Sequence, residues 1–185
     1  SPGTFIPIAE ETGQIVEIGD LVLRKACIDM KKWIDMGIMS GRVAVNLSAR
    51  QFNLPDLTQR IDKILKETGL SPNNLELEIT EGTVMDNPQQ AINVMHQLRD
   101  RGIQLALDDF GTGNNNVQIV QRVSPDYLKV DKEFIRGIES NEVKKKLLMT
   151  LSDIGTMSDC KIIQEGVETI EQQEILCKLG YRFQQ

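Results

Sequence analysis

The stretch LALDDFGTG at Leu105–Gly113 begins as an apolar run and ends in two adjacent carboxylates, Asp108 and Asp109, which enter a glycine-rich turn. A short apolar run bounded by a turn is typical of a buried strand. Two neighbouring anions repel each other unless cations lie between them, and Mg²⁺ and Mn²⁺ take carboxylate oxygens as ligands. We therefore interpret this strand end as a metal-binding position. A turn in which one Asp caps the backbone and the other is solvated is the alternative.

The same pattern continues on both sides of this stretch, where short runs rich in Val, Ile and Leu alternate with longer segments of helical periodicity. Strands are predicted near Arg42–Ser48, Leu75–Thr80, Ile103–Phe110, Tyr127–Asp131, Lys161–Glu165 and Tyr181–Gln184. Helices are predicted near Gly13–Met36, Leu57–Gly69, Pro88–Arg101, Asn115–Arg122, Asn141–Ser158 and Ile170–Leu179, with Gly69, Gly102 and Gly180 as helix stops. Alternation of this kind indicates βα units around a parallel sheet.

The predicted strands are apolar along most of their length and become polar near their C-terminal ends. The polar residues at these ends are Asn46, Glu78, Asp108, Asp109, Lys129 and Glu165. In a (β/α)8 barrel the functional side chains project from strand C-termini, whereas an open doubly wound sheet gathers them at one switch point. We therefore predict the α/β class and a modified (β/α)8 TIM-like barrel. With 185 residues against the roughly 250 typical of this barrel, it is expected to be incomplete in this chain.

Two of the strand ends, Asn46 and Glu78, are expected to join Asp108 in a cluster of oxygen ligands. Taken singly, Asn46 also fits a turn former that bonds its own backbone, and Glu78 also fits a surface residue. Glu81 follows Glu78 by three positions, where it either holds the glycine-rich loop through a hydrogen bond or is a helix-entry charge.

The remaining strand ends supply the candidates for proton transfer. Lys129 is the only cation among them, and it could orient an attacking water or stabilise developing phosphate charge; a structural ion pair is the alternative. Glu165 and Glu168 lie on either side of Gly166, a residue that permits close approach of the backbone. One of these glutamates could be a general base and the other a ligand or loop anchor, although EGVET alone also fits a capped helix start.

Composition excludes several classes of function. A net charge of −6 argues against binding of duplex nucleic acid, which requires a face rich in Lys and Arg. The three cysteines are odd in number and have no metal-ligand spacing, so we expect a reducing compartment without a disulfide framework. No run approaches the roughly 20 apolar residues of a membrane span.

His96 is assigned no role and is expected to be partly exposed. Trp33 is expected to be a core residue.

Six linked motifs resemble the EAL phosphodiesterase family in order and spacing across essentially the whole chain. They are FIPIAEETGQI, VAVNLSARQF, LELEITEG, LALDDFGTG, DYLKVDKEFI and EGVET. The resemblance implies a modified (β/α)8 barrel with one reversed strand, Mg²⁺ or Mn²⁺ as cofactor, and hydrolysis of cyclic di-GMP to linear pGpG. It also implies a cytoplasmic domain whose parent protein can carry a membrane anchor, a homodimer in the intact protein, and a fused sensory or GGDEF-type domain.

Site residues carry over by position from this resemblance. Asn46, Glu78 and Asp108 resemble the ligands of the first metal, and Asp109 resembles the holder of the second metal or its bridging water. The catalytic positions are Lys129, near the nucleophilic water, and Glu165, a ligand or base. The supporting positions are Glu81, Glu168 and Gln185, of which the last resembles the glutamine of the family's closing motif.

Three departures from the family pattern are visible. The Glu-Ala-Leu signature with its metal-binding glutamate would precede Ser1, and the chain stops at Gln185, so residues 1–185 are expected to form one domain without its first strand and C-terminal end. Asn114, Asn115 and Asn116 replace an aromatic residue and two serines after the glycine-rich turn. This replacement leaves open the alternative of a degenerate domain that binds cyclic di-GMP as a receptor without cutting it. A purely protein-binding scaffold, which would bind neither metal nor nucleotide, is a third reading.

Overall fold

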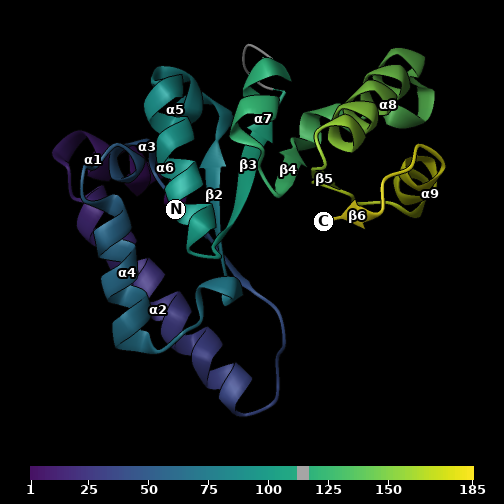
Figure 1. Ribbon diagram of the computed structural model, residues 1–185. Coiled ribbons are helices and arrows are strands. Elements are labelled where there is room, and N and C mark those ends of the chain that lie inside the picture. The colour runs from purple at the N-terminus through teal and green to yellow at the C-terminus, as the bar shows by residue number, and fades with distance from the viewer. Residues whose placement is uncertain (112–116) are drawn as a thin grey trace. The chain divides into compact units, whose positions relative to one another are not determined.

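The computed structural model describes residues 1–111 and 117–185, with side chains described outside 117–119 (Figure 1). Its strands are β1 (Val43–Asn46), β2 (Leu75–Thr80), β3 (Gln104–Phe110), β4 (Tyr127–Val130), β5 (Lys161–Gln164) and β6 (Phe183–Gln184). Its α-helices are α1 (Pro2–Thr12), α2 (Ile15–Asp35), α3 (Ala49–Phe52), α4 (Leu57–Thr68), α5 (Glu81–Asp86), α6 (Pro88–Asp100), α7 (Val117–Val123), α8 (Glu142–Met157) and α9 (Ile170–Lys178). Three 3₁₀ helices, η1 (Pro72–Asn74), η2 (Lys132–Phe134) and η3 (Ile138–Ser140), complete the described elements.

The strands form one sheet in the order β1-β2-β3-β4-β5-β6, which is also their order along the chain. Strand β1 pairs in parallel with β2, and β3, β4, β5 and β6 pair in parallel in succession. A doubly wound sheet would reverse its order at a switch point, and this sheet does not. The order therefore agrees with the singly wound α/β fold predicted from the strand ends. The reversed strand implied by the family resemblance stays a prediction.

Every predicted strand and helix has a counterpart within a few residues, although the start of the helix predicted at Asn115–Arg122 lies outside the described residues. Gly69, Gly102 and Gly180 follow helices with φ of 71°, 88° and 91°, as expected for left-handed helix stops. The prediction omitted α1, α3 and α5. Helices α3 and α5 are only four and six residues long, and α1 is 11 residues long with Pro7 inside it.

The chain divides into two compact units. Unit 1 contains residues 1–79 and 89–105, and unit 2 contains residues 80–88 and 106–185. Strand β3 contributes residues to both.

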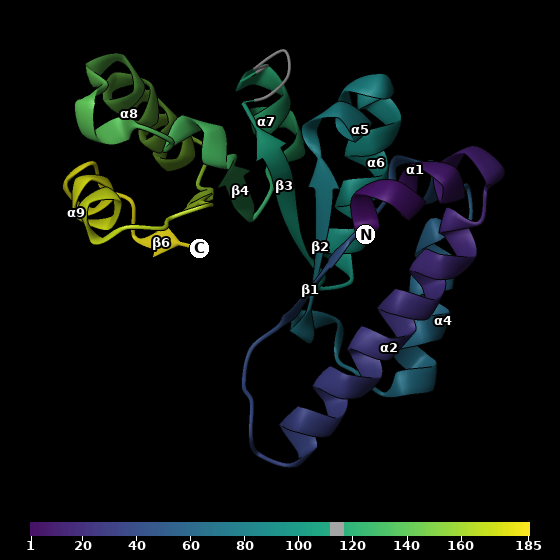
Figure 2. The same cartoon turned by 180° about the vertical axis from the view of Figure 1, so that it is seen from behind.

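In unit 1, helices α2 and α4 lie side by side, as both views show (Figures 1 and 2). Helix α2 buries Leu23, Cys27 and Met30 on one face, and α4 buries Ile61 among other residues. These positions recur every three to four residues, the spacing of one helix face. Our expectation for Trp33 was wrong, because its side chain is 41% exposed near the C-terminal end of α2.

In unit 2, helix α8 packs against β5 and η3. Leu148 on α8 is fully buried, and its carbonyl accepts a hydrogen bond of 2.9 Å from the hydroxyl of buried Tyr181. Burial raises the pKa of Tyr181, because the charged phenolate would lose its hydration. The segment that leads into β6 is thus tied to α8.

Across the described residues, no helix combines the length and apolar character that a membrane crossing requires.

Candidate functional site

The C-terminal ends of β1 and β2 lie side by side in unit 1. Asn46 is the register partner of Glu78, and the backbone N–H of Leu47 donates to the carbonyl of Glu78 at 2.9 Å. The Glu78 side chain is buried to 8% exposure, which disagrees with the alternative of a surface glutamate. Unit 1 therefore presents an amide and a buried carboxylate on neighbouring strand ends.

A β-bulge shapes the end of β3 in unit 2. Leu107 pairs with Leu128 and Phe110 pairs with Val130, so Asp108 and Asp109 together oppose the single residue Lys129 on β4. Asp109 takes the positive φ of 54°, a conformation that Asp tolerates better than most residues. Bulges of this kind redirect side chains, and they are enriched beside active sites. The two carboxylates predicted from LALDDFGTG therefore occupy a specialised backbone position.

In unit 2, Lys129 lies between the carboxylates of Asp108 and Glu165. Its side chain is 6% exposed, and its Nζ lies 2.6 Å from Oε1 of Glu165 and 3.7 Å from Oδ1 of Asp108. The structure therefore brings together three of the residues that the sequence analysis selected. The ion pair agrees with both readings of Lys129, a catalytic and a structural one.

Carboxylates crowd around Asp109. Its pKa is raised by burial first, and then by the negative charges of Asp108, Asp131 and Glu165, while Lys129 opposes the shift. Excess negative charge in a partly desolvated place is the environment that a bound cation stabilises. The carboxylate oxygens of unit 2 are of the chemical type that a hard divalent ion prefers.

The glycine-rich turn after β3 is tied to the start of α5. Buried Glu81 accepts a hydrogen bond of 3.2 Å on Oε2 from the backbone N–H of Gly111. Its Oε1 is also buried and has no hydrogen-bond partner among the described residues. Glu81 thus contacts the loop that we expected it to hold. Asn114–Asn116, which depart from the family pattern, lie outside the described residues.

The EGVET segment closes against the end of the chain. The N–H of Val167 donates to the carbonyl of Gln185 at 3.1 Å, and the N–H of Gln185 donates to the carbonyl of Gln164 at 2.9 Å. A Cβ on Gly166 would lie 2.4 Å from Cβ of Lys132, which confirms the expected close approach. The Glu168 side chain lines two shallow surface hollows rather than the Lys129 cluster.

The expected three-residue metal cluster of Asn46, Glu78 and Asp108 draws on both units, and it stays a prediction. Over residues 1–111 and 117–185, no group of three or more His, Cys, Asp or Glu side chains has an arrangement suited to a metal ion. In unit 2 the ammonium group of Lys129 lies between Asp108 and Glu165 and supplies positive charge there.

Sequence reasoning missed two residues close to this cluster. Asp131 caps η2 by accepting from the N–H of Glu133 at 2.7 Å, and its charge acts on Asp109. Its position directly after the strand of Lys129 could have identified it. Gln164 is fully buried at the end of β5. Gln164 also ends an apolar run, but the charged Glu165 directly follows it, so the sequence signal was assigned to Glu165.

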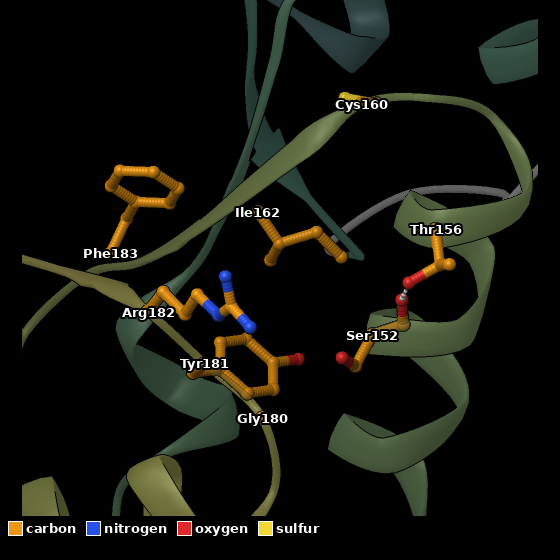
Figure 3. Close-up of a pocket in the computed structure, with 8 residues that line it drawn as sticks. All are labelled: Ser152, Thr156, Cys160, Ile162, Gly180, Tyr181, Arg182 and Phe183. Atoms are coloured by element: carbon orange, nitrogen blue, oxygen red, sulfur yellow. Dashed lines mark hydrogen bonds between the residues drawn. The ribbon is translucent and has the colours of Figure 1, made fainter.

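A separate cavity of about 350 Å³ lies in unit 2 between α8 and the starts of β5 and β6 (Figure 3). Its walls include Ser152, Thr156, Ile162, Tyr181 and Arg182. It borders the N-terminal ends of these strands, whereas Lys129 and Glu165 lie at the C-terminal ends. Functional residues of parallel α/β barrels lie at the C-terminal ends, so we do not assign chemistry to this cavity.

Comparisons with known proteins agree with the fold and the motifs. The family model of the EAL domain matches residues 1–185. The bifunctional diguanylate cyclase/cyclic di-GMP phosphodiesterase MucR of Pseudomonas aeruginosa is 38% identical over 180 residues, which are 97% of this chain and 26% of that protein. The chain spans about a quarter of the length of the curated relatives it matches.

Solved structures show the same fold. The PaMucR phosphodiesterase in complex with c-di-GMP matches with a TM-score of 0.92 and 38% identity, over 97% of this chain and 73% of that one. The manganese/cyclic di-GMP complex of Klebsiella pneumoniae BlrP1 matches with a TM-score of 0.77 and 28% identity, over 88% of this chain and 42% of that one. The predicted α/β fold class is confirmed, and the chain belongs to the EAL domain family.

Proposed function

We propose that this EAL domain hydrolyses cyclic di-GMP to linear pGpG with bound Mg²⁺ or Mn²⁺. The observation that carries the proposal is the buried Lys129, held between Asp108 and Glu165 at successive strand ends beside the crowded carboxylate of Asp109. Relatives named as cyclic di-GMP phosphodiesterases support the substrate. A related structure whose title names manganese and cyclic di-GMP supports a divalent metal.

Asn46, Glu78, Asp108 and Asp109 are proposed as the metal-holding residues. Each carries an oxygen donor at or beside a strand end, and oxygen donors are the ligands that Mg²⁺ and Mn²⁺ prefer. Divalent ions supply positive charge that polarises the phosphodiester and lowers the pKa of water.

The remaining chemistry is assigned to side chains of unit 2. Lys129 is proposed to orient the attacking water and to stabilise negative charge that develops on the phosphate. Glu165 accepts the water proton as the new P–O bond forms and the bond from phosphorus to the leaving ribose oxygen breaks. The leaving ribose oxygen takes up a proton from solvent, and Glu165 later returns its proton to solvent, so the product is linear pGpG. Glu81, Glu168 and Gln185 are proposed to support the loops around these residues.

The proposal is tested with Asp108→Asn in the full-length protein that contains this domain. Replacing one oxygen anion by a neutral amide at the bulge should lower turnover of cyclic di-GMP with Mn²⁺ by about 100-fold or more, as for other groups that act on developing charge. Chromatographic detection of pGpG gives the measurement. Asp153→Asn on the exposed face of α8 is the matched control and should keep its activity.

Two outcomes contradict the proposal. One is equal turnover by the Asp108→Asn and unsubstituted proteins. The other is calorimetric binding of cyclic di-GMP to the unsubstituted protein without any pGpG, which is the behaviour of a receptor.

A further inference from the structure

Gln164 is the last residue of β5, and its side chain is fully buried. It is the register partner of Val130, which directly follows Lys129, and it directly precedes Glu165. A fully buried glutamine is uncommon, because its amide must find hydrogen-bond partners in place of water. Its position therefore raises the question of which groups it binds.

The amide nitrogen of Gln164 faces three backbone carbonyls at the ends of two strands. Nε2 lies 3.2 Å from the carbonyl oxygen of Val130, 3.3 Å from that of Asp131 and 2.9 Å from that of Glu165. The N–H of Glu165 also donates to the carbonyl of Val130 at 3.1 Å. The side chain thus continues the link between β4 and β5 beyond their last ladder pair.

The register of β4 and β5 places Gln164 and Lys129 on opposite faces of the sheet. Side chains alternate between the two faces of a strand, so Gln164 shares its face with Ile162. That face is turned toward α8, because a Cβ on Gly155 of α8 would lie 2.5 Å from Cγ1 of Ile162. Lys129 is the register partner of Ile163 and belongs to the opposite face.

The amide oxygen of Gln164 does not stabilise the fold. Its Oε1 is buried and has no hydrogen-bond partner among the described residues, which opposes folding. An apolar side chain of the same length would avoid this penalty. The feature that an apolar residue cannot reproduce is the donation from Nε2 to the carbonyls beside Lys129 and Glu165.

We propose that Gln164 is a positioning residue, which holds the ends of β4 and β5 so that Lys129 and Glu165 stay within 2.6 Å of each other. This inference rests on the proposed phosphodiesterase function. Small displacements of groups around a reacting centre reduce turnover strongly even when binding is kept.

The test compares two variants of the full-length protein. Gln164→Met keeps the length of the side chain and removes the donor, and we expect kcat for cyclic di-GMP with Mn²⁺ to fall about 10-fold while KM changes less than about twofold. Ile162→Val is the control on the same strand and face. It should lower the thermal midpoint and keep kcat within about twofold of the unsubstituted protein.

Amide hydrogen exchange supplies a measurement that does not depend on activity. Peptides covering residues 129–132 and 163–167 should exchange at least about threefold faster in Gln164→Met, because local opening of the strand ends becomes easier. The same peptides should be unchanged in Ile162→Val. If the unsubstituted protein does not hydrolyse cyclic di-GMP, the proposed function fails while this arm still decides whether Gln164 holds the strand ends.

The inference is overturned if Gln164→Met retains the unsubstituted kcat, or if its exchange pattern is unchanged. It is equally overturned if Ile162→Val loses kcat to the same extent, since the loss would then follow stability alone.

Discussion

At the scale of single residues, one buried cation faces several carboxylates. Only 6% of the Lys129 side chain is exposed, whereas its partners Asp108 and Glu165 are 14% and 25% exposed. Charges in such a place have lost much of their hydration, so their mutual attraction has to compensate. Removal of the cation leaves the carboxylates to repel each other.

The substitution Lys129→Met should therefore destabilise the domain as well as reduce its turnover. We expect the free energy of unfolding to fall by about 3 kcal/mol, because breaking a buried pair leaves uncompensated charge. Urea denaturation in a metal-free buffer gives the measurement. Lys178→Met, at the exposed end of α9, is the control and should change the free energy little. Equal stabilities for the two variants would show that the pair contributes nothing to folding.

Most of the site residues could be identified from a local sequence pattern. Asn46, Glu78, Asp108, Lys129 and Glu165 were selected because a polar residue interrupts an apolar strand near its end, and such a signal can be read locally. Gln164 gives the same signal, yet it was passed over beside the charged Glu165. Its importance depends on carbonyls of Val130 and Asp131, which are distant in sequence.

At the scale of elements, local backbone geometry places the acidic residues. The bulge in β3 gives Asp108 and Asp109 one position opposite Lys129, and the turn at Gly166 brings the backbone against Lys132. Gly166 has a φ of 72°, where residues with a Cβ are strained. The two features lie on either side of Lys129.

Substitution of two glycines tests whether the turn at Gly166 requires a residue without a Cβ. Gly166→Ala should lower the free energy of unfolding by about 1–3 kcal/mol, because the new Cβ needs a positive φ and collides with Lys132. Gly82→Ala, in α5 with open space around it, should raise the free energy by about 0.5 kcal/mol. Thermal denaturation of both variants gives the comparison. A Gly166→Ala variant as stable as the unsubstituted domain would contradict the described turn.

Elements were predicted well where their periodicity was long and less well where they were short. Helices α2, α4, α6, α8 and α9 have repeating apolar faces over several turns. Helix α3 spans Ala49–Phe52 and begins with a capping box of Ser48 and Gln51, a signal of only a few residues. The β3 bulge has no periodic signature, because it appears only when β3 pairs with β4.

At the scale of the whole molecule, the chain has two compact units, and the cysteines report on both of them. Cys27 is completely buried in unit 1, Cys160 is buried in unit 2, and Cys177 is exposed. Burial raises the pKa of Cys27 from 9.0 to about 11, and the charge of Arg24 opposes the shift. The thiolate that reacts with alkylating reagents is therefore scarce at Cys27.

In labelling at pH 8, we expect Cys177 to react first and Cys27 only when unit 1 unfolds. Mass spectrometry of labelled peptides over time measures both rates, and Cys177→Ser should remove the fast phase. Because the folded state holds the proton of Cys27 more tightly, its contribution to stability is complete below pH 9.0 and falls as the pH rises toward about 11. Fast labelling of Cys27 in the folded protein would contradict its burial.

The sequence alone determined the α/β class, the approximate positions of six strands, and the family to which the motifs point, because these follow from periodicity and from residues close together in the chain. Only the tertiary structure decided that Lys129 lies between Asp108 and Glu165, that Asp108 and Asp109 share a bulge, and that Gln164 links two strand ends. These features depend on backbone pairing between strands that lie 20 or more residues apart, for which a linear pattern carries no geometric information.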